Sequence, residues 1–172
     1  MSPAAQMVSE LMSQPVVSVG PGARVEEVRA LAKSRGVHHV PIVQRGKVLG
    51  VVCTCDLGDA SPDVRVLQLA RRNLVTALPS CSASDAAKLM KDNAVGSVLI
   101  SNRDGLWGIV TRDDLSRADA ELARSLAELE CSACHSKHHL RQSSGDTLLC
   151  VACAERANSA HWFDEGGGGG GD

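Results

Sequence analysis

The chain has 172 residues, 44% of them hydrophobic, and a formal net charge of −2 with neutral histidines. This length fits one compact domain with a small appended module. The charge indicates no general affinity for polyanions, and no stretch approaches twenty apolar residues, so we expect no membrane span. Tyrosine is absent and only three aromatic residues occur, so the core must be aliphatic. The lack of a targeting segment, together with thiols that we expect to be reduced, implies the cytoplasm.

The chain contains the same pattern twice between residues 8 and 115. A shift of 58 positions places Val8–Leu57 on Val66–Leu115 without a gap. Identical pairs include Val17/Val75, Pro21/Pro79, Leu31/Leu89, Val37/Val95, Ile42/Ile100, Gly50/Gly108, Val52/Val110 and Asp56/Asp114. Each copy is too small to bury its apolar face alone, so the two copies should pack together with pseudo-symmetric clefts where they meet.

The first elements, in chain order, belong to copy one. A helix starting at Ser2-Pro3 should present an apolar face that includes Val8 and Met12, and an extended segment follows at 15–19. A second helix carries Val25, Val28, Leu31 and Ala32 on one face and ends at Gly36. Segments 37–43 and 48–52 should then pair as a hairpin across the glycine-containing turn 45–47.

Copy two repeats this order after a polar connector, Gly58–Asp63. Ser82 should cap a helix with Asp85 three residues later, and Ala86, Leu89 and Met90 form its apolar face. Strands are expected at 95–100 and 106–110, with the turn at 102–105. The fold class is therefore α/β (α+β), a pseudo-symmetric pair of repeats.

These residues resemble the CBS domain family. One motif is formed by Met12–Val16, Gly36–Val43 and Gly50–Leu57, and Gly108–Leu115 resembles the end of a second. The resemblance covers about two thirds of the chain. It implies a tandem CBS pair (a Bateman module), which in that family is often a homodimer, binds adenosine nucleotides and regulates a partner.

The resemblance also implies a ligand site at the end of the last strand of copy two. Asp114 would accept hydrogen bonds from ribose hydroxyls, because an ionised carboxylate is an acceptor with two oxygens. Thr111 would meet phosphate or ribose, Arg112 would add a phosphate contact, and backbone near Thr76 and Val95 would sandwich the base. The alternative is that Asp114 caps a helix starting near Ser116.

Copy one departs from this pattern. The corresponding residues are Ser18, Val37, His39 and Asp56, but the threonine position is occupied by Cys53. Since a thiol is a weak hydrogen-bond partner, site one is weaker, differently specific or empty. His39 could reach a phosphate, although a histidine here is more often a hydrogen-bonded strand residue.

Cys53-Thr54-Cys55 suggests a redox function. Residues i and i+2 of a strand lie about 6.5–7 Å apart at Cα, at the limit for a disulfide. We therefore expect buried reduced cysteines that act as small hydrophobes, as at Cys81, and keep a thiol-redox sensor as the weaker alternative.

The last third of the chain carries a metal-binding pattern. Cys131-x-x-Cys134 and Cys150-x-x-Cys153 are separated by fifteen residues, the spacing of a tetrahedral Cys₄ site. Zinc is the expected ion, with iron as the competitor, and the closed thiolate shell makes it structural. The segment resembles a treble-clef or zinc-ribbon module. His135, His138 and His139 lie between the two cysteine pairs and are expected to be solvated.

The expected organisation has five parts. Copy one with its N-terminal helix covers 1–59, copy two 60–115, a linker helix 116–130, the zinc module 131–160 and a disordered glycine-rich tail 161–172. Residues 131–172 have three basic and five acidic residues, a charge of −2, which disfavours nucleic-acid binding.

The sequence favours a non-catalytic regulatory protein that senses AMP, ADP, ATP or S-adenosylmethionine and uses its zinc module for an unknown protein partner. The alternative is a zinc-dependent nucleic-acid-binding or transcription-associated protein, with a basic patch from Arg71, Arg72, Lys137 and Arg141. An enzyme is not expected, because no catalytic set, open metal site or phosphate-binding loop is present.

Overall fold

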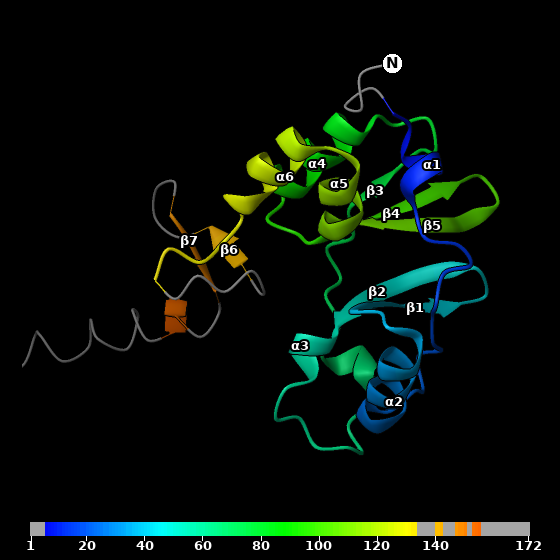
Figure 1. Cartoon of the computed structure of the whole chain (residues 1–172). Helices are drawn as coiled ribbons and strands as arrows, with labels where there is room; N and C mark the ends of the chain where they lie inside the picture. The colour runs from blue at the N-terminus through cyan, green and yellow to red at the C-terminus, as the bar shows by residue number, and fades with distance from the viewer. Residues whose placement is uncertain (1–5, 134–139, 143–146, 151–152, 156–172) are drawn as a thin grey trace, which may run out of the picture. The chain divides into compact units, whose positions relative to one another are not determined.

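The computed structural model describes residues 6–133, 140–142, 147–150 and 153–155. The chain forms two compact units, residues 1–126 and residues 127–172, and each is described by itself. Unit one contains both copies of the repeat, and unit two contains the cysteine pairs (Figure 1).

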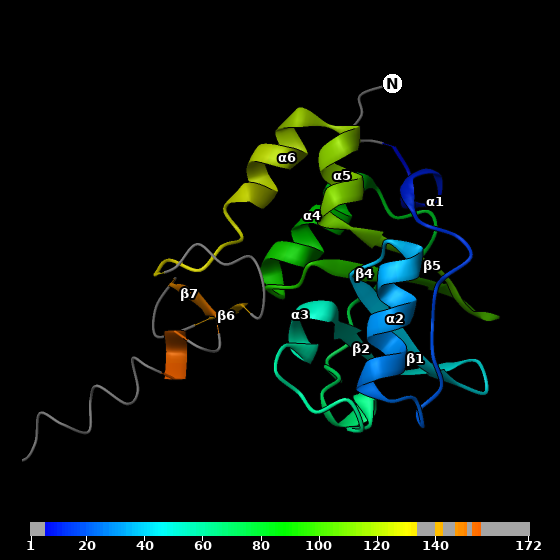
Figure 2. The same ribbon diagram turned by 60° about the horizontal axis from the view of Figure 1, so that its bottom comes forward.

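Copy one consists of a helix packed on a β-hairpin. Helix α2 (Val25–Arg35) lies against the antiparallel pair β1 (His39–Gln44) and β2 (Lys47–Cys53) (Figure 2). Gly36 ends α2 with a φ of 64°, a left-handed conformation that glycine adopts without a Cβ clash, as the sequence predicted. A short helix, α3 (Thr54–Leu57), follows β2 directly. The predicted extended segment adds only one bridge, between Val19 and Ile42.

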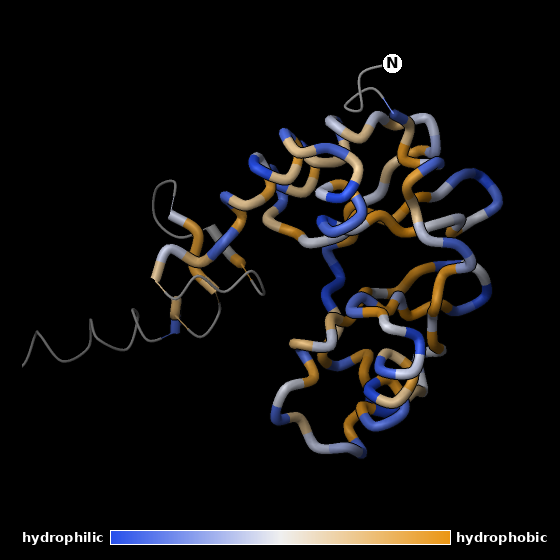
Figure 3. Tube along the Cα trace, in the orientation of Figure 1, coloured by the Kyte–Doolittle hydropathy of each residue, from blue (hydrophilic) through white to orange (hydrophobic). Residues whose placement is uncertain are grey.

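Copy two has the same order with a fuller sheet. Strand β3 (Thr76–Ala77) runs parallel to β4 (Ser97–Asn102), which pairs antiparallel with β5 (Gly105–Thr111). Helix α4 (Ala83–Asp92) is capped by Ser82, whose hydroxyl accepts a hydrogen bond from the Asp85 N–H at 3.1 Å. Hydrophobic residues follow the strands of both copies (Figure 3), so the predicted mixed α/β fold is confirmed.

The two copies exchange their first segments. Helix α1 (Val8–Leu11), at the start of copy one, packs on β5 of copy two, and the 3₁₀ helix η2 (Val66–Gln68), at the start of copy two, packs on β2 of copy one (Figure 1). The backbone bonds obey the same symmetry: Val8 N–H donates to the Cys81 carbonyl at 2.9 Å, and Val66 N–H to that of Ala23 at 3.0 Å. Val66 is fully buried in the core of copy one. Neither copy therefore has a complete core without the other.

A glycine marks each contact of the exchange. A Cβ at Gly50 would lie 2.9 Å from the Ala70 Cβ and 3.1 Å from the Arg71 carbonyl oxygen. The equivalent Gly108 faces Met12, whose Cγ would lie 2.8 Å from a new Cβ. Real Cβ atoms do not approach so closely, so Gly50 requires glycine for the exchanged segment to lie on the strand, whereas at Gly108 the flexible Met12 side chain would have to shift.

The helix predicted over 116–130 is instead two helices. Helix α5 (Arg112–Ala118) starts directly after β5, and α6 (Ala120–Ala127) starts after a break at Asp119. The carboxylate of Asp119 accepts hydrogen bonds from the N–H groups of Glu121 at 2.7 Å and Leu122 at 2.9 Å. This side chain satisfies donors that a continuous helix would have bonded internally, so it begins a new helix.

Unit two contains a short hairpin of β6 (Leu140–Gln142) and β7 (Leu148–Cys150). Residues 143–146, between the two strands, lie outside the described residues. Residues 153–155, which include Cys153, are helical. Among the described residues, no helix is long and apolar enough to cross a membrane.

We predict that Gly50→Ala lowers the free energy of unfolding by about 1–3 kcal/mol, since the new methyl group meets backbone that cannot move away. Urea denaturation measures the effect. Gly22→Ala is the control, because nothing lies within 4 Å of a Cβ there. Equal stability of the two variants would contradict the close approach of the exchanged segment.

Candidate functional site

The junction of β5 and α5 holds the predicted ligand residues Thr111 and Asp114. The Asp114 carboxylate oxygen Oδ2 accepts hydrogen bonds from the Thr111 N–H at 2.8 Å and the Thr111 hydroxyl at 2.7 Å. In return, the Asp114 N–H donates to the Thr111 Oγ1 at 3.3 Å. This reciprocal pair is a capping box, with Thr111 as the cap of α5 and Asp114 as its third residue.

Asp114 therefore has a structural role whatever it binds. The sequence suggested, as an alternative, that Asp114 caps a helix starting near Ser116. Asp114 does help to cap a helix, but that helix is α5, which begins at Arg112. The second carboxylate oxygen, Oδ1, accepts from Arg117 Nη2 at 2.6 Å. The Asp114 side chain is 9% exposed and that of Arg117 is 76% exposed, so the ion pair joins a buried carboxylate to an exposed guanidinium.

Copy one repeats this junction with different side chains. The Asp56 Oδ2 accepts from the Cys53 N–H at 2.9 Å, as Asp114 does from Thr111. Arg71 lies 3.8 Å from the Asp56 Oδ1 and takes the place of Arg117. Its engagement with Asp56 leaves less support for the basic patch considered for nucleic acid; Lys137 lies outside the described residues.

The other predicted ligand residues gather near each junction. In copy two, Thr76 pairs with Leu99, Thr111 pairs with Ser97, and Val95 immediately precedes this part of β4. In copy one, Ser18 precedes the bridge to β1, and Val37 donates its N–H to the Ala32 carbonyl at 3.0 Å. Ser18 and Thr76 are exposed, whereas Val37 and Val95 are half-buried.

Side chains of the two copies meet at Gly96. A Cβ at Gly96 would lie 3.2 Å from His39 Nε2 and 3.4 Å from Arg112 Nη2. Burial lowers the pKa of the Arg112 guanidinium, while nearby Asp113 raises it. The 58-residue shift places Gly96 opposite His38, which is exposed and lies with Nδ1 3.3 Å from the Thr54 hydroxyl. The sequence analysis did not single out Gly96. Its alignment with His38 was the available signal, because copy two has no side chain at a position where copy one has an imidazole.

Cys53 and Cys55 form a disulfide, which corrects the expectation of two reduced cysteines. That expectation assumed a strand through both residues, but β2 ends at Cys53 and Cys55 lies in α3. The turn brings the two Cα atoms to 5.2 Å, well within the range for a disulfide. Cys81 remains a thiol, and burial, followed by the charge of Asp85, raises its pKa.

Three of the four predicted metal ligands lie together in unit two. Among the described residues, the sulfur atoms of Cys131, Cys150 and Cys153 all lie within 4.8 Å of one another, and all three residues are buried. Cys134 lies outside the described residues. Zinc–sulfur bonds of about 2.3 Å in a tetrahedron place sulfurs about 3.8 Å apart, so the cluster fits such an ion with little movement.

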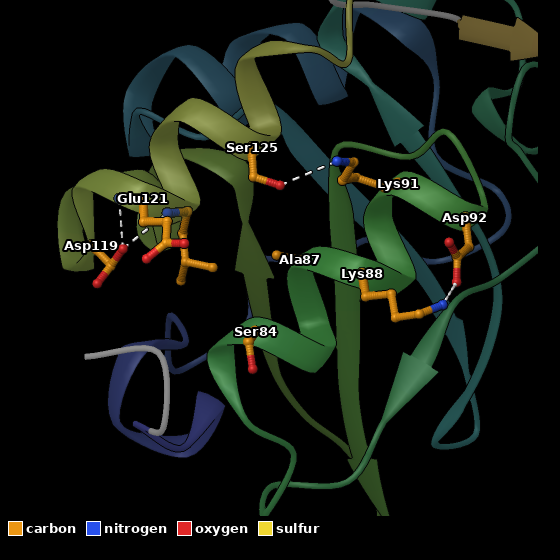
Figure 4. A pocket seen from close by; sticks show the side chains of 9 residues that line it. Ser84, Ala87, Lys88, Lys91, Asp92, Asp119, Glu121 and Ser125 are labelled. Atoms are coloured by element: carbon orange, nitrogen blue, oxygen red, sulfur yellow. Dashed lines mark hydrogen bonds and ion pairs between the residues drawn. The ribbon is translucent and has the colours of Figure 1, made fainter. Parts of the chain in front are cut away.

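A cavity of about 440 Å³ lies between α4 and α6, away from all of these residues (Figure 4). Lys91 donates to the Ser125 hydroxyl at 3.2 Å across it, and Lys88 pairs with Asp92 at its side. The side chains that line it include Ser84, Lys88, Lys91, Asp119, Glu121 and Ser125. Because both basic and acidic side chains line this cavity, its charge does not favour an anionic or a cationic ligand.

Comparison with known proteins identifies the repeat. The family model of the CBS domain matches residues 8–62 and 66–121. The chain belongs to the CBS domain family. The uncharacterized protein MJ0188 of Methanocaldococcus jannaschii is 27% identical over 117 residues, which cover 66% of this chain and 44% of that protein. The chain therefore spans less than half the length of this curated relative.

Solved CBS structures share the fold of the pair. The CBS domain pair of protein MJ0100, in complex with 5′-methylthioadenosine and S-adenosyl-L-methionine, has a TM-score of 0.61 at 23% identity, covering 66% of this chain and 94% of that one. The cytosolic domain of the Mg²⁺ channel MgtE in complex with ATP has a TM-score of 0.58 at 27% identity, covering 66% and 48%. Both of these solved structures are complexes with adenosine-containing ligands.

We predict that Asp114→Ala lowers the free energy of unfolding by about 1–3 kcal/mol, because two Thr111 donors lose a charged acceptor. Arg117→Ala should cost less than about 1 kcal/mol, because its side chain is exposed. Denaturant unfolding of both variants checks the order. Equal losses would show that the ion pair, rather than the capping box, dominates this junction.

Proposed function

We propose that the chain is a non-catalytic regulatory protein that binds an adenosine nucleotide at the β5–α5 junction of its CBS pair. The observation that carries this proposal is the meeting of His39 from copy one with Arg112 from copy two at Gly96. A phosphate chain there would contact donors from both copies, so binding would depend on their arrangement. A ligand shifts a conformational equilibrium when it binds one arrangement better, which is what regulation requires.

The carboxylate of Asp114 suits the ribose end of the same ligand. A carboxylate has about four lone-pair sites, and the contacts with Thr111 and Arg117 occupy three of them. Because Arg117 is exposed, it can turn toward solvent and release Oδ1 to a ribose diol. The base would lie near Val95 and the exposed Thr76.

A ligand series separates phosphate contacts from nucleoside contacts. We predict that Arg112→Ala weakens ATP binding by about tenfold or more, the value of one charge-assisted hydrogen bond. Binding of 5′-methylthioadenosine, which has no phosphate, should change little. Titration calorimetry measures both, and His39→Ala should behave in the same way with a smaller loss.

Arg103→Ala is the matched control, since Arg103 lies in the exposed β4–β5 turn and carries the same charge. Equal losses in Arg112→Ala and Arg103→Ala would reduce the effect to general electrostatics. No binding of AMP, ADP, ATP, S-adenosylmethionine or 5′-methylthioadenosine by the unmodified protein would overturn the proposed function.

We also propose that Cys131, Cys134, Cys150 and Cys153 hold one structural zinc ion, with iron as the competing metal. The buried cluster of three sulfurs supports this, together with the small size of the hairpin, whose two strands have three residues each. The metal would hold unit two together so that it can contact a protein partner.

We predict one metal ion per chain by elemental mass spectrometry, and its loss in Cys150→Ser. Chelation should raise amide exchange at residues 140–142 and 147–150 of unit two and leave the strands of unit one protected. Cys81→Ser is the control and should retain the metal. Loss of metal in Cys81→Ser, or metal-free protein with an intact hairpin, would refute the site.

The proposed assembly is a homodimer. Met7, Leu78 and Trp107 are large apolar side chains in unit one that are 48%, 63% and 44% exposed. Association with a second copy would remove them from water. Light scattering of the full chain tests this, and a monomer at all concentrations would exclude it.

A further inference from the structure

We propose that Cys53 and Cys55 form a reversible dithiol–disulfide site that controls the end of β2 and the start of α3 in copy one. Its effect on a ligand rests on the proposed function, but its effect on local structure does not.

The disulfide occupies the place of a hydrogen-bonding residue. Cys53 in copy one corresponds to Thr111 in copy two, and each pairs across its hairpin with the first residues of the preceding strand: Cys53 with His39, and Thr111 with Ser97. The N–H of Cys53 and that of Thr111 both donate to a carboxylate, at 2.9 and 2.8 Å. The two junctions thus share one backbone arrangement.

The side chains make the difference between the copies. The Thr111 hydroxyl also donates to Asp114 at 2.7 Å. In copy one the sulfur of Cys53 is bonded to that of Cys55 and has no proton to donate. Reduction supplies an S–H group at this position, a weaker donor than a hydroxyl, within the same capping arrangement around Asp56. Reduction therefore makes junction one chemically similar to junction two.

A structural role explains this bond poorly. Cross-links stabilise a fold mainly by restricting the unfolded chain, and the gain falls as the closed loop becomes shorter. Cys53 and Cys55 are separated by two positions, close to the smallest loop that a disulfide can close. A bond that contributes so little to global stability is better suited to local control.

The exchange reaction balances with a dithiol reductant. A thiolate of the reductant attacks the sulfur of Cys55, which is the more exposed of the pair, since Cys53 is only 6% exposed. A mixed disulfide forms, the Cys53–Cys55 bond breaks, and Cys53 leaves as a thiolate that takes up a proton. The second thiol of the reductant then attacks the mixed disulfide and releases Cys55 as a thiol. The protein gains two electrons and two protons, and the reductant becomes a cyclic disulfide.

Peptide mass spectrometry on the full, metal-loaded chain tests the reaction itself. The chain is equilibrated with dithiothreitol or with glutathione disulfide and then alkylated before digestion. Cys53 and Cys55 should be alkylated together after dithiothreitol and should both be protected after glutathione disulfide. Cys81 should be available in both samples, though slow to react, because its raised pKa leaves little thiolate. Alkylation of Cys53 and Cys55 after both treatments would overturn the proposal.

Hydrogen exchange tests the structural effect without any ligand. Amides at 54–57 should exchange several-fold faster in the reduced chain, while the equivalent amides at 112–115 stay unchanged. In Cys53→Thr, which places the side chain of copy two in copy one, exchange at 54–57 should no longer respond to the reductant. A reduced wild-type chain with unchanged exchange at 54–57 would refute the control of α3.

Calorimetry then tests the effect on ligand binding. Reduction, or Cys53→Thr, should strengthen adenosine-ligand binding at copy one by about tenfold, and the variant should be insensitive to redox state. Equal binding in both states, alongside a redox-dependent exchange rate, would refute the coupling alone. Absence of binding in every state would refute the proposed function. The redox site would then be judged by the alkylation and hydrogen-exchange experiments alone, which need no ligand.

Discussion

The reciprocal exchange of α1 and η2 is the contact on which the rest of unit one depends. Val8 of copy one and Val66 of copy two are both fully buried, each against the opposite copy. Gly50 and Gly108 allow these segments to lie directly on β2 and β5, where they form the bridges Val51–Arg71 and Ser13–Ile109. His39 of copy one and Arg112 of copy two both lie close to Gly96, so the candidate ligand site needs both copies.

Each strand-to-helix junction combines structural and functional chemistry in a few residues. Asp56 and Asp114 satisfy backbone N–H groups that the start of a helix leaves without an intrahelical partner, and the same carboxylates have further acceptor sites. A buried carboxylate held in this way loses little additional entropy when it binds a ribose, since its position is already fixed. Its substitution would change folding and the proposed binding together, so the residues on the phosphate side separate the two effects better.

The sequence predicted the repeat, its strands and its helix ends, because apolar periodicity and caps such as Ser82 and Gly36 are local signals. It could not predict the exchange. A 58-residue shift is equally consistent with packing within a copy and across copies. The backbone hydrogen bonds from Val8 to Cys81 and from Val66 to Ala23 show that the packing is across copies. The sequence analysis missed the break at Asp119 because it extended the helix period through a residue whose side chain caps a new helix. It missed the turn at Cys55 because it extended the strand past Cys53, where β2 ends.

The two copies have strand-to-helix junctions with the same backbone arrangement but different side chains at the cap position. In junction two the carboxylate accepts three hydrogen bonds, one of them from a hydroxyl, whose strength does not depend on redox state. Junction one has the same carboxylate and a comparable arginine, but its cap position is a sulfur atom bonded to another sulfur. The proposed redox change at Cys53 and Cys55 would therefore alter junction one and leave the hydrogen bonds of junction two as they are. A CBS pair of this kind would bind a nucleotide at junction two, and the redox state of junction one would adjust how strongly the pair binds a ligand.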